Sequence, residues 1–221
     1  RKVLLFDLDP QANATSGIGL DKKSSRLYEV MIGEESLETA IESSAIENLD
    51  VVKSDHRLAG LEVELARTDG WERVLKERIA PALSSYDLVL FDAPPSLGIL
   101  SMLSLVASDG ILIPIQCEYY ALEGVGQLYT TYHLVRQKMN PDLQIEGVLL
   151  TMYDGRTRLS QQVRSEAESF FKEKVFDTVI PRNVRLAEAP SYGRSILEYD
   201  AASAGSIAYR KLAREWMERG V

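Results

Sequence analysis

The stretch that decides the fold is VLLFDLDPQANATS, Val3–Ser16. Its apolar, β-favouring residues run into two carboxylates, Asp7 and Asp9, and then into Pro10, which favours an end to the strand near this point. A continuous apolar run of this kind is typical of a strand buried in a parallel sheet. Because parallel sheets bind their ligands at the carboxyl ends of the strands, we expect Asp7 and Asp9 to lie at a ligand site.

A second strand of the same kind is predicted at Asp87–Asp92, DLVLFD, and it runs into Ala93–Ser96, APPS. The two prolines of that segment prevent the strand from continuing, so Asp92 is predicted to stand at its end. A carboxylate in that place suits a magnesium ion, held through a water molecule because magnesium keeps much of its hydration shell. An aspartate that only caps the next turn is the plainer alternative. Two such strands in one chain indicate carboxylates gathered around a metal-bound phosphate.

The segment that follows Asp9 is predicted to be a polar loop. Pro10 is expected to turn the Asp9 side chain toward the entrance of the site, where it would orient an attacking water while Asp7 supports the metal shell. The loop carries polar side chains of the kind that sense a γ-phosphate, namely Gln11, Asn13, Thr15 and Ser16. The alternative is a turn rich in aspartate and asparagine whose carboxylates are simply solvated.

The chain alternates predicted strands with predicted helices, which favours an α/β fold: a mostly parallel twisted sheet with helices on both faces. At 221 residues, 45% of them hydrophobic, it is long enough for one substantial core, and we expect one domain over residues 1–221. The expected strands are Lys2–Asp7, Leu49–Lys53, Leu88–Asp92, Gly110–Ile115, Glu146–Met152 and Val175–Ile180. The expected helices are Ser24–Ile32, Leu37–Glu42, Asp69–Leu83, Ala121–Lys138, Leu159–Lys172 and Ser203–Arg219.

Composition and charge limit the cellular compartments and the binding partners that are expected for this chain. No stretch approaches the roughly 18 consecutive apolar residues of a membrane span, no signal peptide is visible, and the single cysteine, Cys117, has no partner for an internal disulfide. A cytoplasmic protein is the default expectation. The net charge of −8 argues against nonspecific nucleic-acid binding by the molecule as a whole. However, residues 156–194 carry 8 basic and 5 acidic side chains, against 13 and 24 in residues 1–155, so the sequence allows a local basic face.

Taken together, the motifs resemble the ParA/Soj family of chromosome- and plasmid-partitioning ATPases, which are P-loop NTPases with a deviant Walker A loop. These segments are spread from end to end of the chain, and together they are more specific than any single nucleotide motif. The segments that carry the resemblance are DLDPQANATSGIG (7–19), FDAPPSLGILS (91–101), PIQCEYYALEG (114–124), EGVLLTMYDGRT (146–157) and VIPRNVRLAEAPSYG (179–193).

The phosphate-binding loop of that family, of the form K-G-G-x-G-K-[ST]-[ST], does not occur in residues 1–221. Its glycines cradle phosphates with backbone amides, and its lysines neutralise them. Because the chain begins with Arg1 and enters a strand at once, we interpret it as cut from a longer protein whose loop and first strand precede Arg1. The resemblance implies that the missing strand lies between the strands of Asp7 and Asp92, so that its loss leaves two unpaired edges. It also implies that the chain without the loop does not bind ATP productively.

The resemblance assigns roles to the residues at the two acidic strand ends. Asp9 matches the acid that the family needs for hydrolysis, and Asp7 matches the supporting acid before it. Asp92 matches the Walker B acid, which holds magnesium through a water. These three residues are therefore the predicted catalytic and metal site.

The resemblance also points to residues in the last third of the chain. Pro181, Arg182 and Asn183 match the stretch that packs against the adenine of ATP. Arg156 and Arg185 match arginines that line the DNA-facing surface of the dimer. Both arginines lie within the locally basic segment, which supports their assignment to a DNA-binding face.

For the intact protein, the resemblance implies ATP and Mg²⁺ as cofactors and a nucleoid-associated cycle. ATP joins two protomers, the homodimer binds DNA nonspecifically, and a ParB-type partner triggers hydrolysis, which releases the dimer. One alternative is a membrane-associated positioning ATPase of the MinD type, because Ser203–Val221 has an apolar stripe; that stripe is rich in alanine and favours docking onto the sheet. The other alternative is a regulatory module that only binds partners, because hydrolysis needs the missing loop.

Overall fold

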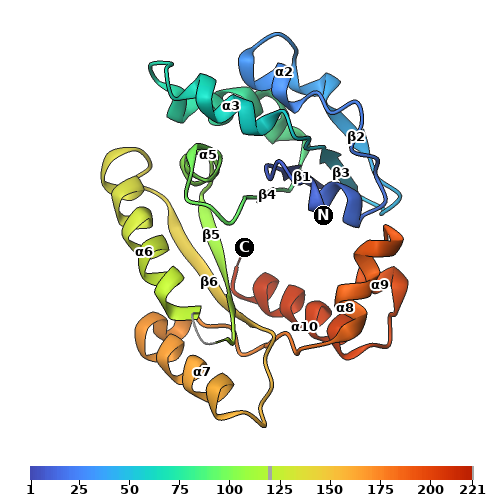
Figure 1. Cartoon of the computed structure of the whole chain (residues 1–221), viewed down its shortest axis with the longest axis vertical. Coiled ribbons are helices and arrows are strands. Elements are labelled where there is room, and N and C mark those ends of the chain that lie inside the picture. The colour runs from blue at the N-terminus through green and yellow to red at the C-terminus, as the bar shows by residue number, and fades with distance from the viewer. Residues whose placement is uncertain (119–120, 221) are drawn as a thin grey trace. The chain divides into compact units, whose positions relative to one another are not determined.

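The computed structural model describes residues 1–118 and 121–220, which form two compact units (Figure 1). The first unit comprises Arg1–Ser108 with Gln137–Pro141, and the second comprises Asp109–Arg136 with Asp142–Val221. Residues 119 and 120, within the family-like segment 114–124, lie outside the described residues. That residues 1–221 act as a single domain stays a prediction.

The first unit is built on a four-stranded sheet of order β2-β3-β1-β4. Three strands are parallel, β1 (Val3–Asp7), β3 (Leu49–Val52) and β4 (Leu88–Asp92), and they confirm the predicted strands to within one residue. The fourth strand, β2 (Ile41–Ser43), is antiparallel to β3.

The strands of Asp7 and Asp92 are direct neighbours. Their register runs from Val3 opposite Leu88 to Asp7 opposite Asp92, and the Leu8 amide extends the ladder to the Asp92 carbonyl. The prediction that a missing strand separates β1 from β4 is therefore wrong. The two strands satisfy each other's backbone groups, which leaves no place for a strand between them. It is β4 that stands at an edge of this sheet.

The helices of the first unit pack around one apolar core that includes Leu4, Phe6, Leu61 and Leu103. Part of the predicted helix Ser24–Ile32 is confirmed as α2, whereas the predicted helix Asp69–Leu83 is split into a 3₁₀ turn at Trp71–Arg73, α4 and a 3₁₀ segment at Ala80–Ser85. Three helices, α1, α3 and α5, are absent from the predicted set, and α1 lies in the segment that was predicted to be a polar loop. The helices are α1 (Asn13–Gly17), α2 (Leu27–Ile32), α3 (Leu58–Leu65), α4 (Val74–Ile79) and α5 (Ile99–Ala107).

The predicted helix Leu37–Glu42 is wrong. Only Leu37–Thr39 makes a 3₁₀ turn, after which the chain extends into β2. Ile41 pairs with Val52 of β3 and packs partly buried against the core. The strand is thus selected by a pairing with a distant part of the chain, which overrides the local helical spacing.

The second unit holds a parallel pair, β5 (Gly110–Gln116) and β6 (Gln144–Thr151), which confirms two more predicted strands. Two long helices follow the predicted spans closely, α6 (Ala121–Lys138) and α7 (Arg158–Phe171). The α7 helix buries Val163, Ala167 and Phe171 against the strands, which is the stripe expected of a helix that covers a sheet.

The predicted strand Val175–Ile180 is only partly present. Its ends lie along β6, where the Phe176 amide donates to the Val148 carbonyl and the Ile180 amide to the Leu150 carbonyl. Between them, the amides of Asp177 and Thr178 donate to the Glu215 carboxylate at 2.8 and 2.9 Å. Because those two amides are bound to a side chain, a regular ladder does not form.

That glutamate belongs to α10 (Ala204–Glu218), which confirms the predicted C-terminal helix; the short helices α8 (Val184–Glu188) and α9 (Ile196–Tyr199) precede it (Figure 1). Leu212, Ala208 and Trp216 of α10 pack against Leu149, Phe176 and Ile180. The apolar stripe is therefore occupied inside the protein, as the sequence favours. Within the described residues, every helix is too short or too polar to cross a bilayer.

Candidate functional site

The two acidic strand ends meet as the sequence predicts. Asp7 and Asp92 are the last residues of neighbouring parallel strands and lie opposite each other in the register. Asp9 lies two residues beyond the end of β1, and its charge acts on Asp92. Asp7 is completely buried, Asp9 is half-buried and Asp92 is exposed. The predicted catalytic and metal residues are thus assembled at one edge of the first sheet.

Asp7 is the buried anchor of this edge. Its Oδ2 accepts the Thr15 amide at 2.8 Å and the Thr15 hydroxyl at 2.7 Å, and its Oδ1 accepts the Asp9 amide at 3.2 Å. Burial raises the pKa of Asp7 above its ordinary value, although the bonds from Thr15 and the Asp9 amide work in the opposite direction. With both oxygens engaged by the following loop, Asp7 holds that loop to the end of β1.

Asp92 carries the clearest electrostatic signal in the first unit. Its pKa is raised to about 6, chiefly because the neighbouring chain removes water from the carboxylate, and secondarily because Asp7 and Asp9 are negatively charged. Among the described residues, none of these three acids forms an ion pair with a lysine, arginine or histidine. Within the described residues, the three acids therefore gather negative charge at this edge that no ion pair balances.

A magnesium ion fits this donor set. Within the described part of the chain, no group of three or more His, Cys, Asp and Glu side chains is placed to hold a metal. Magnesium does not require such a cage, because it is bound through one or two carboxylates and completes its octahedron with water and phosphate oxygens. The exposed Asp92 carboxylate, with further negative charge beside it, is suited to that mode of binding.

The loop after Asp9 is a tight turn and not an open polar segment. The Asp9 Oδ1 accepts the Gln11 amide at 2.9 Å, and the Asp9 carbonyl accepts the Ala12 amide at 2.8 Å. Ala12 has φ 53° and ψ 45°, the left-handed conformation that costs a residue with a Cβ about 1 kcal/mol or more. The turn thus bends the chain sharply into α1.

Sequence reasoning missed one residue of this site and placed another differently. Ser54, which follows β3, is completely buried and donates its hydroxyl to the Asp9 carbonyl at 2.6 Å. Thr15, predicted as part of a phosphate-sensing loop, is also completely buried and is bonded to Asp7. A signal for Ser54 was present, because a hydroxyl two residues beyond a buried parallel strand lies at the ligand edge of the sheet.

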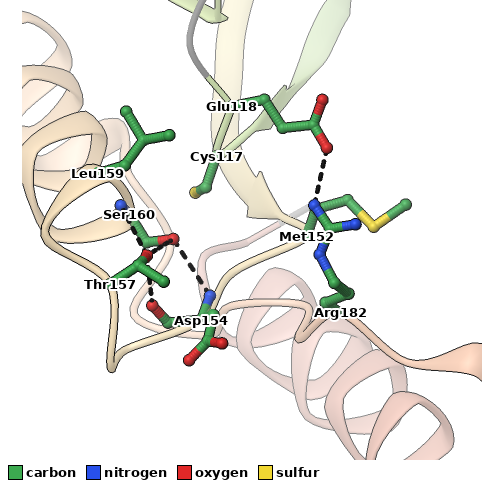
Figure 2. Close-up of a pocket in the computed structure, with 8 residues that line it drawn as sticks. All are labelled: Cys117, Glu118, Met152, Asp154, Thr157, Leu159, Ser160 and Arg182. Carbon is green, nitrogen blue, oxygen red and sulfur yellow. Dashed lines mark hydrogen bonds and ion pairs between the residues drawn. The ribbon is translucent and has the colours of Figure 1, made fainter.

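The second unit has a pocket of about 430 Å³ at the carboxyl ends of its two strands (Figure 2). Cys117 and Glu118 follow β5, and Met152 follows β6, with φ 51°. Burial raises the pKa of the Cys117 thiol to about 11, so it is an inert, protonated wall at neutral pH. The remaining lining residues are Asp154, Thr157, Leu159, Ser160 and Arg182.

The predicted adenine-packing residues reach this pocket along the edge of β6. The Tyr153 amide donates to the Ile180 carbonyl at 3.0 Å, and the Arg182 amide donates back to the Tyr153 carbonyl at 3.2 Å. The Arg182 side chain forms an ion pair with Glu118 at 2.8 Å, which Figure 2 shows beside the pocket. Asn183 instead caps α8 by accepting the Arg185 amide at 2.8 Å. Arg182 is therefore the residue of the Pro181–Asn183 stretch that lines the pocket.

The two predicted DNA-binding arginines are each held by carboxylates. Arg156 is 90% exposed at its side chain, and its guanidinium makes two bonds to Asp154, at 2.9 and 2.8 Å. Arg156 lowers the pKa of Asp154 to about 2. Arg185 pairs with Glu188 at 2.8 Å and with Asp200 at 3.5 Å. Both guanidinium groups lie at the surface, and their charges are largely balanced within the chain.

Comparison with known proteins identifies the family. A family model described as an AAA domain matches residues 1–145. The chromosome-partitioning ATPase Soj of Thermus thermophilus is 48% identical over 219 residues, covering 99% of this chain and 84% of the relative. The chain belongs to the ParA/Soj family of partitioning ATPases. The predicted family is thereby confirmed.

Solved structures place this ParA/Soj chain among the P-loop NTPases. A cobyrinic acid a,c-diamide synthase from Mycobacterium smegmatis, with bound ATP analog and magnesium, is 34% identical; the match covers 98% of this chain and 84% of that one, with a TM-score of 0.82. The cell division ATPase MinD of Pyrococcus furiosus is 27% identical, over 99% and 86% of the two chains, with a TM-score of 0.79. MinD shares the fold at lower identity, so the comparisons favour partitioning over the MinD-type alternative.

Proposed function

We propose that this ParA/Soj chain is the main part of an ATPase that hydrolyses ATP with Mg²⁺ and moves DNA cargo by cycling on and off the nucleoid. The observation that carries the proposal is the register of β1 and β4, which sets Asp7 opposite Asp92 with Asp9 just beyond them. Membership of the family and the nucleotide bound to its structural relatives support the same chemistry.

In this proposal, the three acids have different roles: Asp92 serves the metal, Asp9 serves the attacking water and Asp7 holds the loop. Asp92 would hold Mg²⁺, and the ion would supply charge neutralisation at the phosphates. The Asp9 carboxylate orients the attacking water and accepts its proton. Asp7, buried and bonded on both oxygens, keeps the loop of Asp9 in place. The phosphates are cradled by a glycine- and lysine-rich loop of the kind that the family resemblance implies, which does not occur in residues 1–221.

We assign adenine binding to the pocket of the second unit, at the carboxyl ends of β5 and β6. Arg182 lines a pocket whose walls combine the apolar or uncharged side chains of Met152, Cys117 and Leu159 with the carboxylates of Glu118 and Asp154. Such a combination of apolar walls and a few fixed polar groups is typical of sites for heteroaromatic rings. The backbone of Pro181 and Asn183 positions Arg182 within that stretch.

The intact protein is proposed to act as an ATP-dependent homodimer. Its dimer binds DNA without sequence preference through Arg156 and Arg185, and a ParB-type partner stimulates hydrolysis and release. The exposure of both guanidinium groups and the positive balance of residues 156–194 support a phosphate-binding face there.

The test uses the protein expressed with the residues encoded ahead of Arg1. Asp9→Ala is expected to lower ATP turnover by roughly a hundredfold or more, because the water loses its base, and to leave ATP-dependent dimerisation and DNA binding intact. The measurement is steady-state phosphate release, combined with the mass of the dimer and DNA binding in the presence of ATP.

The matched control is Asp21→Ala, since Asp21 is exposed and also accepts the amide two residues along the chain, that of Lys23 at 2.6 Å. Turnover of this variant should stay within about twofold of the unmodified protein, because no reacting group is removed. Equal turnover in the two variants would refute the role of Asp9. No hydrolysis at all by the unmodified protein would instead support a regulatory module that only binds partners.

A further inference from the structure

Ser54 ties together the two ends of the loop that carries Asp9. It lies two residues beyond the end of β3, on the opposite side of β1 from β4, and is completely buried. Its hydroxyl donates to the Asp9 carbonyl at 2.6 Å, and its amide donates to the Thr15 hydroxyl at 3.2 Å. One residue therefore contacts the start and the end of a loop from which it is separated by about forty positions of sequence.

The contact continues to the buried anchor of the site. The Thr15 hydroxyl, which accepts from Ser54, donates in turn to Asp7 at 2.7 Å. All three residues of this relay are completely excluded from solvent. Buried hydrogen bonds that share donors and acceptors in this way restrict one another, so the loop has few alternative positions.

The Asp9 side chain depends on this backbone for its direction. Its Oδ1 accepts the Gln11 amide, which belongs to the same turn and moves with it. The turn itself contains Ala12 in a left-handed conformation, which relaxes if the surrounding bonds are lost. The hydrogen bond from the Ser54 hydroxyl joins the Asp9 carbonyl to a residue outside the loop, in the segment that follows β3.

We propose that Ser54 is a positioning residue for hydrolysis, which acts by fixing the Asp9 peptide so that the carboxylate stays aligned with the attacking water. The inference rests on the proposed function, since it assumes that Asp9 serves the water. Ser54 itself touches neither ATP nor the reacting atoms in this scheme.

The experiment measures ATP hydrolysis by the protein carrying the residues ahead of Arg1. Ser54→Ala keeps the backbone amide and removes only the hydroxyl. Its kcat is expected to fall about tenfold, because a misplaced carboxylate is less effective, while the KM for ATP stays within about twofold. Ser54→Thr, which restores a hydroxyl, is expected to recover most of the lost kcat.

The matched control is Ser104→Ala. Ser104 of α5 is also buried, in the same unit, and donates its hydroxyl to a backbone carbonyl, that of Ser101 at 2.7 Å. Both alanine variants should lose similar thermal stability, and only Ser54→Ala should lose kcat. If Ser54→Ala does not fold, Ser54→Cys, a near-isosteric change with a weaker donor, is used in its place and should show the same fall in kcat.

The outcomes separate this inference from the function on which it rests. Hydrolysis that is abolished by Asp9→Ala but equal in the Ser54 and Ser104 variants would overturn the role of Ser54 alone. A joint rise in KM without a fall in kcat would also overturn it, because that pattern indicates lost nucleotide binding. Absence of hydrolysis in the unmodified protein would remove the proposed function together with the positioning role.

Discussion

The acids at the strand ends of the first unit and Asp154, which follows β6 in the second unit, lie in opposite electrostatic conditions. At the ends of β1 and β4, Asp7 and Asp92 have raised pKa values, and neither pairs with a basic side chain among the described residues. Beyond β6, Asp154 is held by Arg156, which lowers its pKa to about 2. One edge therefore carries unbalanced negative charge, whereas the other carries acids that neutralise arginines.

This difference indicates what each edge binds. Crowded carboxylates without a counterion are stabilised when a cation arrives, which is the condition that a Mg²⁺–nucleotide site requires. Arginines already paired with carboxylates bind an external phosphate only by exchanging one anion for another. We therefore expect nucleotide binding in the first unit to relieve repulsion, and DNA binding in the second unit to compete with internal ion pairs.

The largest expected effect comes from reversing the charge of the arginines. Arg156→Glu and Arg185→Glu should each weaken DNA binding by about tenfold or more, and each should reduce the slope of log affinity against log salt by about 1, because one phosphate contact is lost. The measurement is DNA binding with ATP over a series of salt concentrations. Arg26→Glu is the control, since Arg26 of the first unit is similarly exposed and paired with Glu35. An unchanged slope in both test variants would break the assignment of this face.

A moderate effect is expected from the pH dependence of stability without nucleotide or divalent cation. An acid whose pKa is higher in the folded state destabilises the fold once it ionises, so Asp92 should lower the free energy of unfolding as pH rises from about 4, near its unfolded pKa, to about 6, its folded pKa. Because the side chain is exposed, the loss should be about 1 kcal/mol or less. Asp92→Asn should flatten this part of the profile in urea unfolding, and added Mg²⁺ should reduce it in the unmodified protein. Identical profiles for the two proteins would show that the pKa of Asp92 is not raised in the folded protein.

The smallest expected effect is a gain of function. Asp154→Asn removes the carboxylate that neutralises Arg156, so DNA affinity should rise by about two- to threefold, the value of a weak exposed ion pair. Asp177→Asn is the control, because Asp177 is exposed in the same unit and forms no ion pair within the described residues. If both variants gain affinity equally, net charge alone explains the result and the competition between internal and external anions is disproved.

The sequence predicted the parts of the fold that depend on local pattern. The apolar strands that end in Asp7 and Asp92, and the long amphipathic helices α6, α7 and α10, follow from periodicity and from prolines. The pairing of β1 with β4 was predicted wrongly, because the order of parallel strands is set by packing between distant segments and leaves no mark within either strand.

The finer parts of the site escaped prediction for a related reason. The contact of Ser54 with Asp9 and the contact of Glu215 with Asp177 join residues far apart in sequence. No sequence spacing around a serine or a glutamate indicates which distant residue it will contact. The ion pair of Arg156 with Asp154 was easier to predict from the sequence than these two contacts. Asp154 lies two residues before it, at a distance that favours a turn closed by the aspartate side chain.

The attachment of α10 has a practical consequence for studies in cells. Glu215 holds the amides of Asp177 and Thr178, and Arg219 donates to the carbonyls of Glu173, Lys174 and Val175. The α10 helix and Arg219 after it therefore hold residues 173 to 178, the segment that leads to Arg182. A fluorescent reporter joined to this helix would therefore disturb the bonds that hold residues 173 to 178, which lead to Arg182.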